Sequence, residues 1–404
     1  MKRRIVPGLP APTTPPHIAT LILLAGISAL SMNIFLPSLP GMAEYFQTDY
    51  RLMQLSVALY LGMNAVLQVV IGPISDKFGR RPLILWGLAV FCLATLGCLL
   101  SHNAYVFLAF RMVQAVVVIT MVLSRAVVRD IYDQDRAASM IGYVTMGMAV
   151  VPMIGPAIGG VLEELFGWTA NFWMLLACGL LVLAVSWRDL GETAPPSTNT
   201  LAQQFREYPE LLTAPRFWGY CLSAAFGSGA FFAYLGGAPF VGSEVFGLTP
   251  GVLGFYFATP AIGYFMGNWA TGLLSVRMGL NRMVLIGALS CVTGMGLSLA
   301  FSYAGYSGPL VFFGFMTMVG LGNGMVIANA TAGMLSVRPH LAGTASGLGG
   351  AIMIGGGAGL SALAGALLVP GRGEFPLVWI MFLTSLLSVT AIVFVIRRER
   401  RLGI

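Results

Sequence analysis

The chain has 404 residues, of which 57% are hydrophobic and only 9% are charged, and its mean hydropathy is +0.84. This number of charged residues is too small to cover a water-exposed surface, and the composition therefore excludes a soluble domain. It predicts that lipid surrounds most of the chain. The net charge of +7 is spread over short polar segments between apolar runs. It therefore gives no indication of a nucleic-acid-binding surface.

Apolar runs close to the length that crosses a bilayer, about 20 residues, recur along the whole chain. The first run is too long for the apolar core of a cleaved signal peptide, so it is predicted to be a retained span. The twelve predicted spans are 18–39, 52–72, 83–101, 105–124, 138–162, 169–187, 216–240, 250–274, 283–303, 309–331, 344–369 and 377–396.

The basic residues predict the orientation of these spans. Of the 22 lysines and arginines, only Arg51 and Arg372 fall on the side opposite the N-terminus, and Arg111 falls inside a span. Basic residues collect on the cytoplasmic side of membrane proteins. We therefore expect a multi-pass protein with both termini in the cytoplasm.

A polar segment, 188–215, is rich in Pro, Thr and charge and separates six predicted spans from six. It predicts an N-terminal six-helix bundle over 1–190, a cytoplasmic linker over 191–215 and a C-terminal six-helix bundle over 216–404. The loops 72–85 and 272–285 align at an offset of 200 residues, with matching Gly, Ser and basic positions, between the second and third spans of each half. Such a parallel repeat is typical of alternating-access transporters, which hold substrate between the halves.

Several segments resemble known signatures. "GPISDKFGRRPLI" resembles the loop signature of the major facilitator superfamily, "RMVQA" its fourth-helix signature and "GMAVVPMIGPAIGGVL" its fifth-helix antiporter signature. "MNIFLPSLPGMAEYF", "SRAVVRDIY" and "ANATAGML" with "PHLAGTASGLGG" are similar to the Bcr/CflA drug-resistance branch. The resemblance implies an all-α membrane protein of twelve transmembrane helices, in two six-helix bundles related by pseudo-two-fold symmetry. It also implies proton-coupled efflux of small amphipathic compounds, drugs or metabolites, across the bacterial inner membrane.

The loop signature predicts a conformational latch. Asp76 lies just beyond a span end, where a carboxylate can accept hydrogen bonds from a facing helix N-terminus and pair with an arginine such as Arg129. The alternative is that these charges only set the topology. The predicted latch residues are Gly72, Asp76, Gly79, Arg80, Arg81, Arg129 and Asp130.

The fifth-helix signature predicts a bendable helix. Prolines interrupt backbone hydrogen bonds and allow bending, and small residues let helices approach closely. Tight packing without any bending is an equal alternative. The residues concerned are Gly147, Pro152, Gly155, Pro156, Gly159 and Gly160.

Arg111 is the one charge predicted to lie inside a span, roughly 9 Å from the span's end at about 1.5 Å per residue. An unpaired charge in hydrocarbon is expensive, so it needs a partner. Two interpretations are open. Arg111 lines a cavity for substrate or for proton coupling, or it holds backbone carbonyls near the "LPSLP" kink of the first helix.

No acidic residue lies within a predicted span. The resemblance places a proton-carrying acid where this chain has Asn33, and an amide cannot titrate. Proton coupling is then weak, or it depends on Glu163, Glu164 or a loop acid. The alternative function is a facilitator or exchanger of small organic anions, with Arg111 as counter-charge and little proton coupling.

The remaining candidates are polar or aromatic groups suited to a mostly apolar ligand. The predicted substrate and coupling cavity contains Asn33, Tyr60, Asn64, Arg111, Gln114, Phe231, Tyr234, Tyr256, Asn268 and Asn323. The spans contain no paired acids, metal-spaced histidines or Ser/His pair, so we expect neither an enzyme nor a metal site, and no cofactor. The expected partners are a small-molecule substrate, protons if coupling exists and membrane lipids, but no nucleic acid, and a monomer is expected.

Overall fold

The computed structural model describes residues 16–132, 134–193, 208–338, 341–369 and 371–403. Every regular element in these ranges is helical. The first half contains α1 (Ile18–Asn33), η1 (Leu36–Ser38), α2 (Leu39–Tyr45), α3 (Tyr50–Phe78), α4 (Arg80–Leu99), α5 (Ala104–Gln114), η2 (Ala115–Val117), α6 (Val118–Ile131), α7 (Gln134–Phe166) and α8 (Thr169–Asp189).

The second half repeats this pattern of long helices. It contains α10 (Tyr208–Leu212), α11 (Pro215–Phe240), the π-helical turn η3 (Val241–Val245), α12 (Pro250–Tyr256), α13 (Thr259–Met278), α14 (Leu280–Tyr303), α15 (Pro309–Val337), α16 (Ala342–Leu367) and α17 (Phe375–Leu402).

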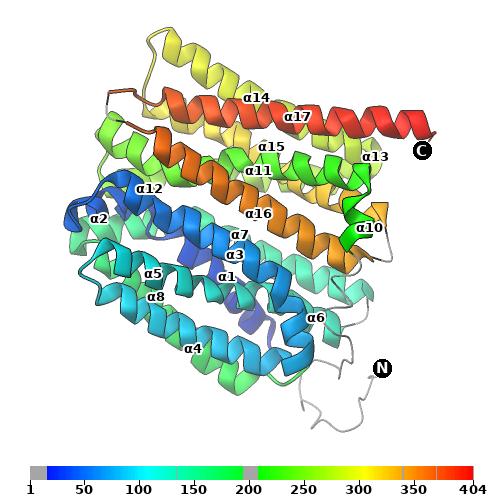
Figure 1. The fold of residues 1–404 in the computed structure, drawn as a ribbon, viewed down its shortest axis with the longest axis horizontal. Coiled ribbons are helices and arrows are strands. Elements are labelled where there is room, and N and C mark those ends of the chain that lie inside the picture. Colours follow the sequence, from blue (N-terminus) through cyan, green and yellow to red (C-terminus); the bar gives the residue numbers. More distant parts are fainter. Residues whose placement is uncertain (1–15, 133, 194–207, 339–340, 370, 404) are drawn as a thin grey trace.

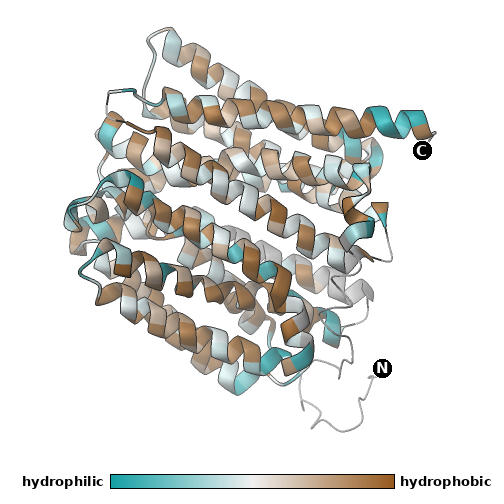
Figure 2. Ribbon diagram, viewed as in Figure 1, coloured by the Kyte–Doolittle hydropathy of each residue, from teal (hydrophilic) through white to brown (hydrophobic). Residues whose placement is uncertain are grey.

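The helices form a membrane fold. Within the described ranges, ten helical segments are long and apolar enough to cross a bilayer. The two other predicted spans, 138–162 and 250–274, coincide with α7 and with α12 followed by α13. The long helices lie side by side (Figure 1), apolar residues predominate along them, and hydrophilic residues gather at their ends (Figure 2). The predicted all-α membrane protein is confirmed.

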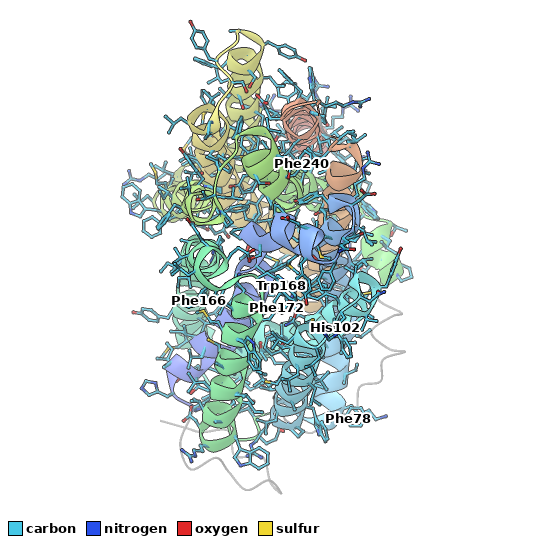
Figure 3. The ribbon with its side chains drawn as sticks, turned by 90° about the vertical axis from the view of Figure 1, so that its left-hand side faces the viewer. Phe78, His102, Phe166, Trp168, Phe172 and Phe240 are labelled. Atoms are coloured by element: carbon cyan, nitrogen blue, oxygen red, sulfur yellow. The ribbon has the colours of Figure 1, made fainter. Side chains whose placement is uncertain are left out.

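The helices pack into two groups. In the first half α1 contacts α6, α7 and α8, and α4 contacts α5 and α8; in the second, α15 lies against α13 and α14, and α11 against α17. Figure 3 views the molecule from one end and shows second-half helices above first-half helices. The main contacts between the groups are α3 with α16 and α7 with α12. The boundaries at residues 190 and 216 stay a prediction.

Glycines bring α13 and α15 close together. At Gly263 and Gly267 a Cβ atom would collide with backbone atoms of α15, and at Gly320 and Gly324 it would collide with backbone atoms of α13. Small residues of this kind let helix backbones approach and gain van der Waals contact in a membrane. One face of α13 is thereby used for packing, while Asn268 and Trp269 on other faces stay exposed.

The predicted repeat is visible in the backbone. Gly79 follows α3 with φ 92° and ψ 155°, and Gly279 follows α13 with φ 82° and ψ 155°. Each N–H donates to the carbonyl of the serine four residues earlier at 2.9 Å. The 200-residue offset is therefore confirmed at these two loops.

Aromatic side chains repeat in the same way. Phe46 follows α2, and its ring centroid lies 5.5 Å from that of Phe107 in α5. Phe246 follows η3, and its ring centroid lies 6.0 Å from that of Phe312 in α15. Equivalent helix ends thus carry equivalent aromatic pairs, as duplication predicts.

The two loop glycines give a matched test. Alanine is strained at these backbone angles by about 1–3 kcal/mol, so Gly79→Ala and Gly279→Ala should both lower thermal stability in detergent. A Cβ at Gly79 would also collide with the Glu192 carboxylate, whereas nothing lies within 4 Å of a Cβ at Gly279. We expect Gly79→Ala to cost clearly more. Equal losses of thermal stability in the two variants would show that displacing the Glu192 carboxylate costs nothing, and that Glu192 does not stabilise this turn.

Candidate functional site

Arg111 lies in a closed polar cluster where α1 ends. Its side chain is 1% exposed. Nη2 donates to the Ser31 carbonyl at 2.7 Å, Nη1 donates to the Ser31 hydroxyl at 3.2 Å, and Nη1 also donates to the Gln114 side-chain carbonyl. Because the backbone continues from α1 into η1 only a few residues later, Arg111 binds the first helix just before its break.

Two aromatic rings enclose the same guanidinium. Its central carbon lies 4.3 Å from the ring centroid of Phe35 and 4.1 Å from that of Tyr60. A cation over an aromatic face is attracted by the ring quadrupole, most strongly where water is absent. Arg111 therefore joins α1, α3 and α5 through stacking as well as hydrogen bonds.

Gln114 extends the cluster to a fourth helix. Its Nε2 donates to the Thr95 hydroxyl of α4 at 2.8 Å, and Thr95 in turn donates to the Phe91 carbonyl at 2.7 Å. Among the described residues, no carboxylate forms a salt bridge with Arg111. Of the two interpretations above, this geometry supports the one in which Arg111 holds the kink of the first helix.

Asn33 and Asn64 do not join this cluster. The Asn33 amide is buried and donates to the Ala29 carbonyl of its own helix at 2.7 Å. The Asn64 oxygen accepts from Gln68, one turn further along α3, at 3.0 Å. Of the predicted cavity residues in the first half, the structure brings together Tyr60, Arg111 and Gln114.

The second-half candidates separate into buried and exposed groups. Tyr234 is fully buried among aromatic rings, with Phe257 at 5.0 Å between centroids, and Tyr256 stacks on Phe313 at 4.8 Å. Phe231 stacks against Tyr234 at 6.2 Å. These residues form an aromatic core, so the structure adds no support for Tyr234 as a cavity residue.

The two asparagines of the second half have opposite environments. Asn323 is 3% exposed. Asn268 is exposed, and its Nδ2 donates to the Tyr264 carbonyl of its own helix at 2.8 Å. Of the five second-half candidates, only Asn268 is exposed.

Arg125 is a polar residue that the sequence analysis missed. The predicted span 105–124 ended one residue before it, and α6 continues to Ile131. The Arg125 Nε is buried without a hydrogen-bond partner. Arg125 interacts electrostatically with Tyr264 of the other half and with Arg129.

Hydrogen bonds between α3 and the second half cluster at one end of the molecule. The Tyr50 hydroxyl donates to the Gly236 carbonyl at 2.8 Å, and Gln54 Nε2 donates to the Ser361 carbonyl at 2.6 Å and to its hydroxyl at 2.9 Å. Phe240, labelled in Figure 3, packs on Tyr50 with ring centroids 5.2 Å apart.

Glu164 of α7 adds a contact at the same end. Its Oε2 accepts from the Gly251 N–H at 3.0 Å and from the Thr249 hydroxyl at 3.3 Å, at the start of α12. With Tyr50 and Gln54 it forms what we call the interhalf lock. This end carries the starts of α3 and α12 and lies opposite the end of α17 (Figure 1). Polar residues at span ends are common in sequence, so no local pattern marked Tyr50 or Gln54, and Glu164 was named only as a possible proton carrier.

The fifth-helix motif packs tightly. Pro152 and Pro156 lie inside the continuous helix α7. A Cβ at Gly159 would collide with the Ile34 carbonyl, and one at Gly160 would collide with the Pro250 carbonyl of the other half. Gly155 faces Leu30 and Asn33 of α1. The packing alternative is thus directly supported, while bending stays a prediction; the surroundings of Gly147 lie outside the described part.

Two of the predicted latch residues, Arg80 and Asp130, pair within the first half. Arg80 Nε lies 3.2 Å from an Asp130 carboxylate oxygen, and Arg80 also donates to the Ser75 hydroxyl. Ser75 donates to the Gly72 carbonyl at 2.7 Å. Arg129 is exposed, and the side chain of Asp76 lies outside the described residues. The predicted pairing of Asp76 with Arg129 is therefore not tested.

Glu192 is the latch residue that the sequence analysis missed. Its two carboxylate oxygens accept from the Arg80 N–H at 2.8 Å and the Arg81 N–H at 3.2 Å, at the start of α4. A carboxylate there satisfies free N–H groups and interacts favourably with the helix dipole. Arg81 returns a bond to the Leu190 carbonyl at 2.6 Å. The partners are more than 100 residues apart, so only the fold reveals them.

Comparisons with known proteins agree with this architecture. The model of the Major Facilitator Superfamily matches residues 21–362. A chloramphenicol resistance protein of Pseudomonas aeruginosa is 30% identical over 81% of this chain and 78% of its own length, and multidrug resistance protein D of Escherichia coli (strain K12) is 28% identical over 91% and 93%. The predicted resemblance to the drug-resistance branch is confirmed.

A solved structure shows the same fold. The inward-facing, occupied form of a bacterial homologue of the human lysosomal transporter Spinster superposes with a TM-score of 0.70 at 18% identity, covering 95% of this chain and 96% of that one. At this identity the likeness speaks for the fold alone. It matches the helical architecture described above.

The enclosed arginine gives a stability prediction. Arg111→Lys keeps the charge but loses the planar fork, so the two bonds to Ser31 and the stacking cannot all be kept. We expect a loss of about 2 kcal/mol in thermal stability and a marked loss of function. Arg372→Lys, at an exposed position, is the control. An unchanged melting temperature for Arg111→Lys would contradict the kink-holding role.

Proposed function

Because the chain belongs to the Major Facilitator Superfamily, a family of transporters and not of enzymes, we propose that it exports small amphipathic compounds, drugs or metabolites, by alternating access. Protons entering the cell drive the export. The protein works as a monomer in the bacterial inner membrane with both termini in the cytoplasm. The drug-resistance names of the relatives support the direction and the substrate class.

The observation that carries this proposal is the position of the interhalf lock. The bonds of Tyr50, Gln54 and Glu164 to the second half all lie at the end opposite the chain's C-terminus. In the proposed orientation this end faces outward, so the structure represents a state closed to the outside. Alternating access requires these bonds to break when the outer end opens.

The enclosure of Arg111 weighs against the alternative of an anion facilitator centred on that residue. Its guanidinium is 1% exposed and already bound to Ser31 and Gln114. An arriving anion would have to displace these partners and two aromatic rings. The drug-resistance relatives favour efflux as well.

Proton coupling needs a titratable group, and Glu163 is the best candidate. It lies at the outer end of α7, just beyond the predicted span 138–162. One carboxyl oxygen is buried without a hydrogen-bond partner, and the other lies where Gly41 leaves room for it. Burial raises the pKa of the Glu163 carboxyl, and the Ser38 hydroxyl lowers it by less. Glu163 is also adjacent to Glu164 of the interhalf lock, so protonation of Glu163 would take place at the helix end that carries the lock.

The lock can be tested by removing its amide. Gln54→Leu keeps much of the volume but removes the donor to Ser361, so we expect the closed outer end to lose about 1 kcal/mol or more, roughly a fivefold shift toward opening. The measurement is the labelling rate of a cysteine at Ala364, a fully buried position on α16, by an impermeant maleimide. Gln68→Leu is the control, because the Gln68 side chain also lies against α16, near Gly350, but donates its hydrogen bond to Asn64 of α3. Equal labelling in both variants would refute the lock.

The proton proposal predicts a pH effect of definite sign. A raised pKa keeps Glu163 protonated to higher pH, so proton-driven export should fall as the external pH rises through that pKa. Glu163→Gln mimics the protonated form, and drug export into vesicles should become independent of the pH gradient. Glu44→Gln, an exposed acid at the same end, is the control. Gradient-driven export that survives in Glu163→Gln would move the proton site elsewhere.

A further inference from the structure

The end of α17 combines unusual length with a concentration of arginines. Arg397, Arg398, Arg400 and Arg401 follow one another there, with Glu399 as the one acid between them. The helix has 28 residues and is therefore about 42 Å long, whereas the hydrocarbon core of a bilayer is about 30 Å thick. In Figure 1 this end projects beyond the neighbouring helices, and in Figure 2 it is mainly hydrophilic. The arginines thus lie where α17 leaves the hydrocarbon.

Glu399 determines which way these arginines face. Its side chain is buried, and its carboxylate accepts from Arg216 Nε of α11 at 3.0 Å and from the Asn281 amide of α14. Arg397 and Arg401 lie two residues before and after Glu399, which places them on the opposite face of a helix with 3.6 residues per turn. Because the acid is held against α11 and α14, both arginines point away from the protein and are exposed.

The arginine face continues the apolar surface of α17. Exposed side chains recur along this helix at intervals of three and four residues, and they are Leu383, Leu387, Thr390, Phe394, Arg397 and Arg401. Residues at this spacing share one helix face, and in a membrane an exposed apolar face lies against acyl chains. Arg397 lies about 4.5 Å and Arg401 about 10.5 Å beyond Phe394 along the axis. The headgroup region is about 5–7 Å deep on each side of the hydrocarbon, so the two guanidinium groups lie at the level of the lipid phosphates.

The last span of the first half lacks this extension. α8 has 21 residues, which is about 32 Å and just enough to cross the hydrocarbon. At its end Arg188 is exposed, and the next residue, Asp189, accepts from the His17 N–H at the start of α1 at 2.8 Å. Topology requires basic residues near span ends, and Arg188 meets that requirement. The longer α17 with its arginines goes beyond what topology requires.

The chemistry of this surface selects an anionic phospholipid. A guanidinium presents its N–H donors in a planar fork that matches a phosphate, and basic clusters directly beyond a membrane span attract anionic lipids. The exposed Arg282 follows Asn281 at the start of α14, which packs along α17, and adds a further cation close by. A zwitterionic lipid carries its own ammonium group beside the phosphate. An anionic lipid has no such competitor for the phosphate and gains more from the arginines.

We propose that the end of α17 is a docking surface for anionic phospholipids. Their phosphate groups bind Arg397, Arg400 and Arg401, while their acyl chains lie along Leu387 and Phe394. In the proposed orientation the lipids belong to the inner leaflet. The docking surface does not depend on the direction or the coupling of transport.

The test measures lipid binding to the purified full-length protein in detergent by native mass spectrometry. The probes are phosphatidylglycerol and phosphatidylcholine with identical acyl chains. We expect phosphatidylglycerol to bind at least tenfold more tightly, and we expect the combined substitution Arg397→Gln, Arg400→Gln and Arg401→Gln to reduce this preference below threefold.

A matched variant controls for the loss of charge. Arg51→Gln, Arg188→Gln and Arg372→Gln together remove three exposed arginines elsewhere, and this variant should keep the full preference. Thermal unfolding of both variants shows whether they are folded.

Three results would overturn the proposal. These are equal binding of the two lipids, a preference that survives in the folded α17 variant, and complete displacement of phosphatidylglycerol by inorganic phosphate at constant ionic strength. The last result would assign the surface to soluble anions. Because lipid binding is measured without transport, a failure of drug export in vesicles would reject the proposed function and leave this result standing.

Discussion

The structure depends on one constraint: a polar group inside a membrane must find its partner within the protein, because hydrocarbon offers none. At the break of the first helix, the two terminal nitrogens of Arg111 meet this requirement with Ser31 and the Gln114 side-chain carbonyl, and two aromatic faces cover the guanidinium, while its Nε is buried without a hydrogen bond. The same cluster joins α1, α3, α4 and α5, so Arg111 stabilises the packing of these helices. Asn33 meets the requirement within its own helix.

The constraint also separates what is fixed from what can move. Each half has its own packed helices, with its loop glycine and its aromatic pair in equivalent places. The bonds of the interhalf lock are few and lie at one end. On the first-half helix α6, the Arg125 Nε is buried without a hydrogen-bond partner among the described residues. Interhalf bonds confined to one end are what a transporter held in one of two states would have.

The fold could be predicted from the sequence because membrane helices are recognised by the length and hydropathy of their apolar runs. The repeat could also be predicted, since Gly79 and Gly279 are matching glycines in the two loops and both have the positive φ that glycine adopts easily. The site was less predictable. Arg111 was found because a lone charge in an apolar run is visible, but its enclosure depends on Phe35 and Tyr60 from other helices. Gln54, Glu192 and Arg125 were missed because the residues they interact with are distant in the sequence and become neighbours only in the fold.

Distances across the halves during transport test the account most directly. Spin labels at Glu44 and Glu244 report the outer end, and labels at Lys77 and Arg277 report the opposite end; both pairs are exposed and related by the 200-residue repeat. The five native cysteines form no disulfide and can be replaced. We predict that a proton gradient with substrate lengthens the first distance while it shortens the second. If both distances lengthen or both shorten, or if neither changes during turnover, the two ends do not open alternately and the account is wrong.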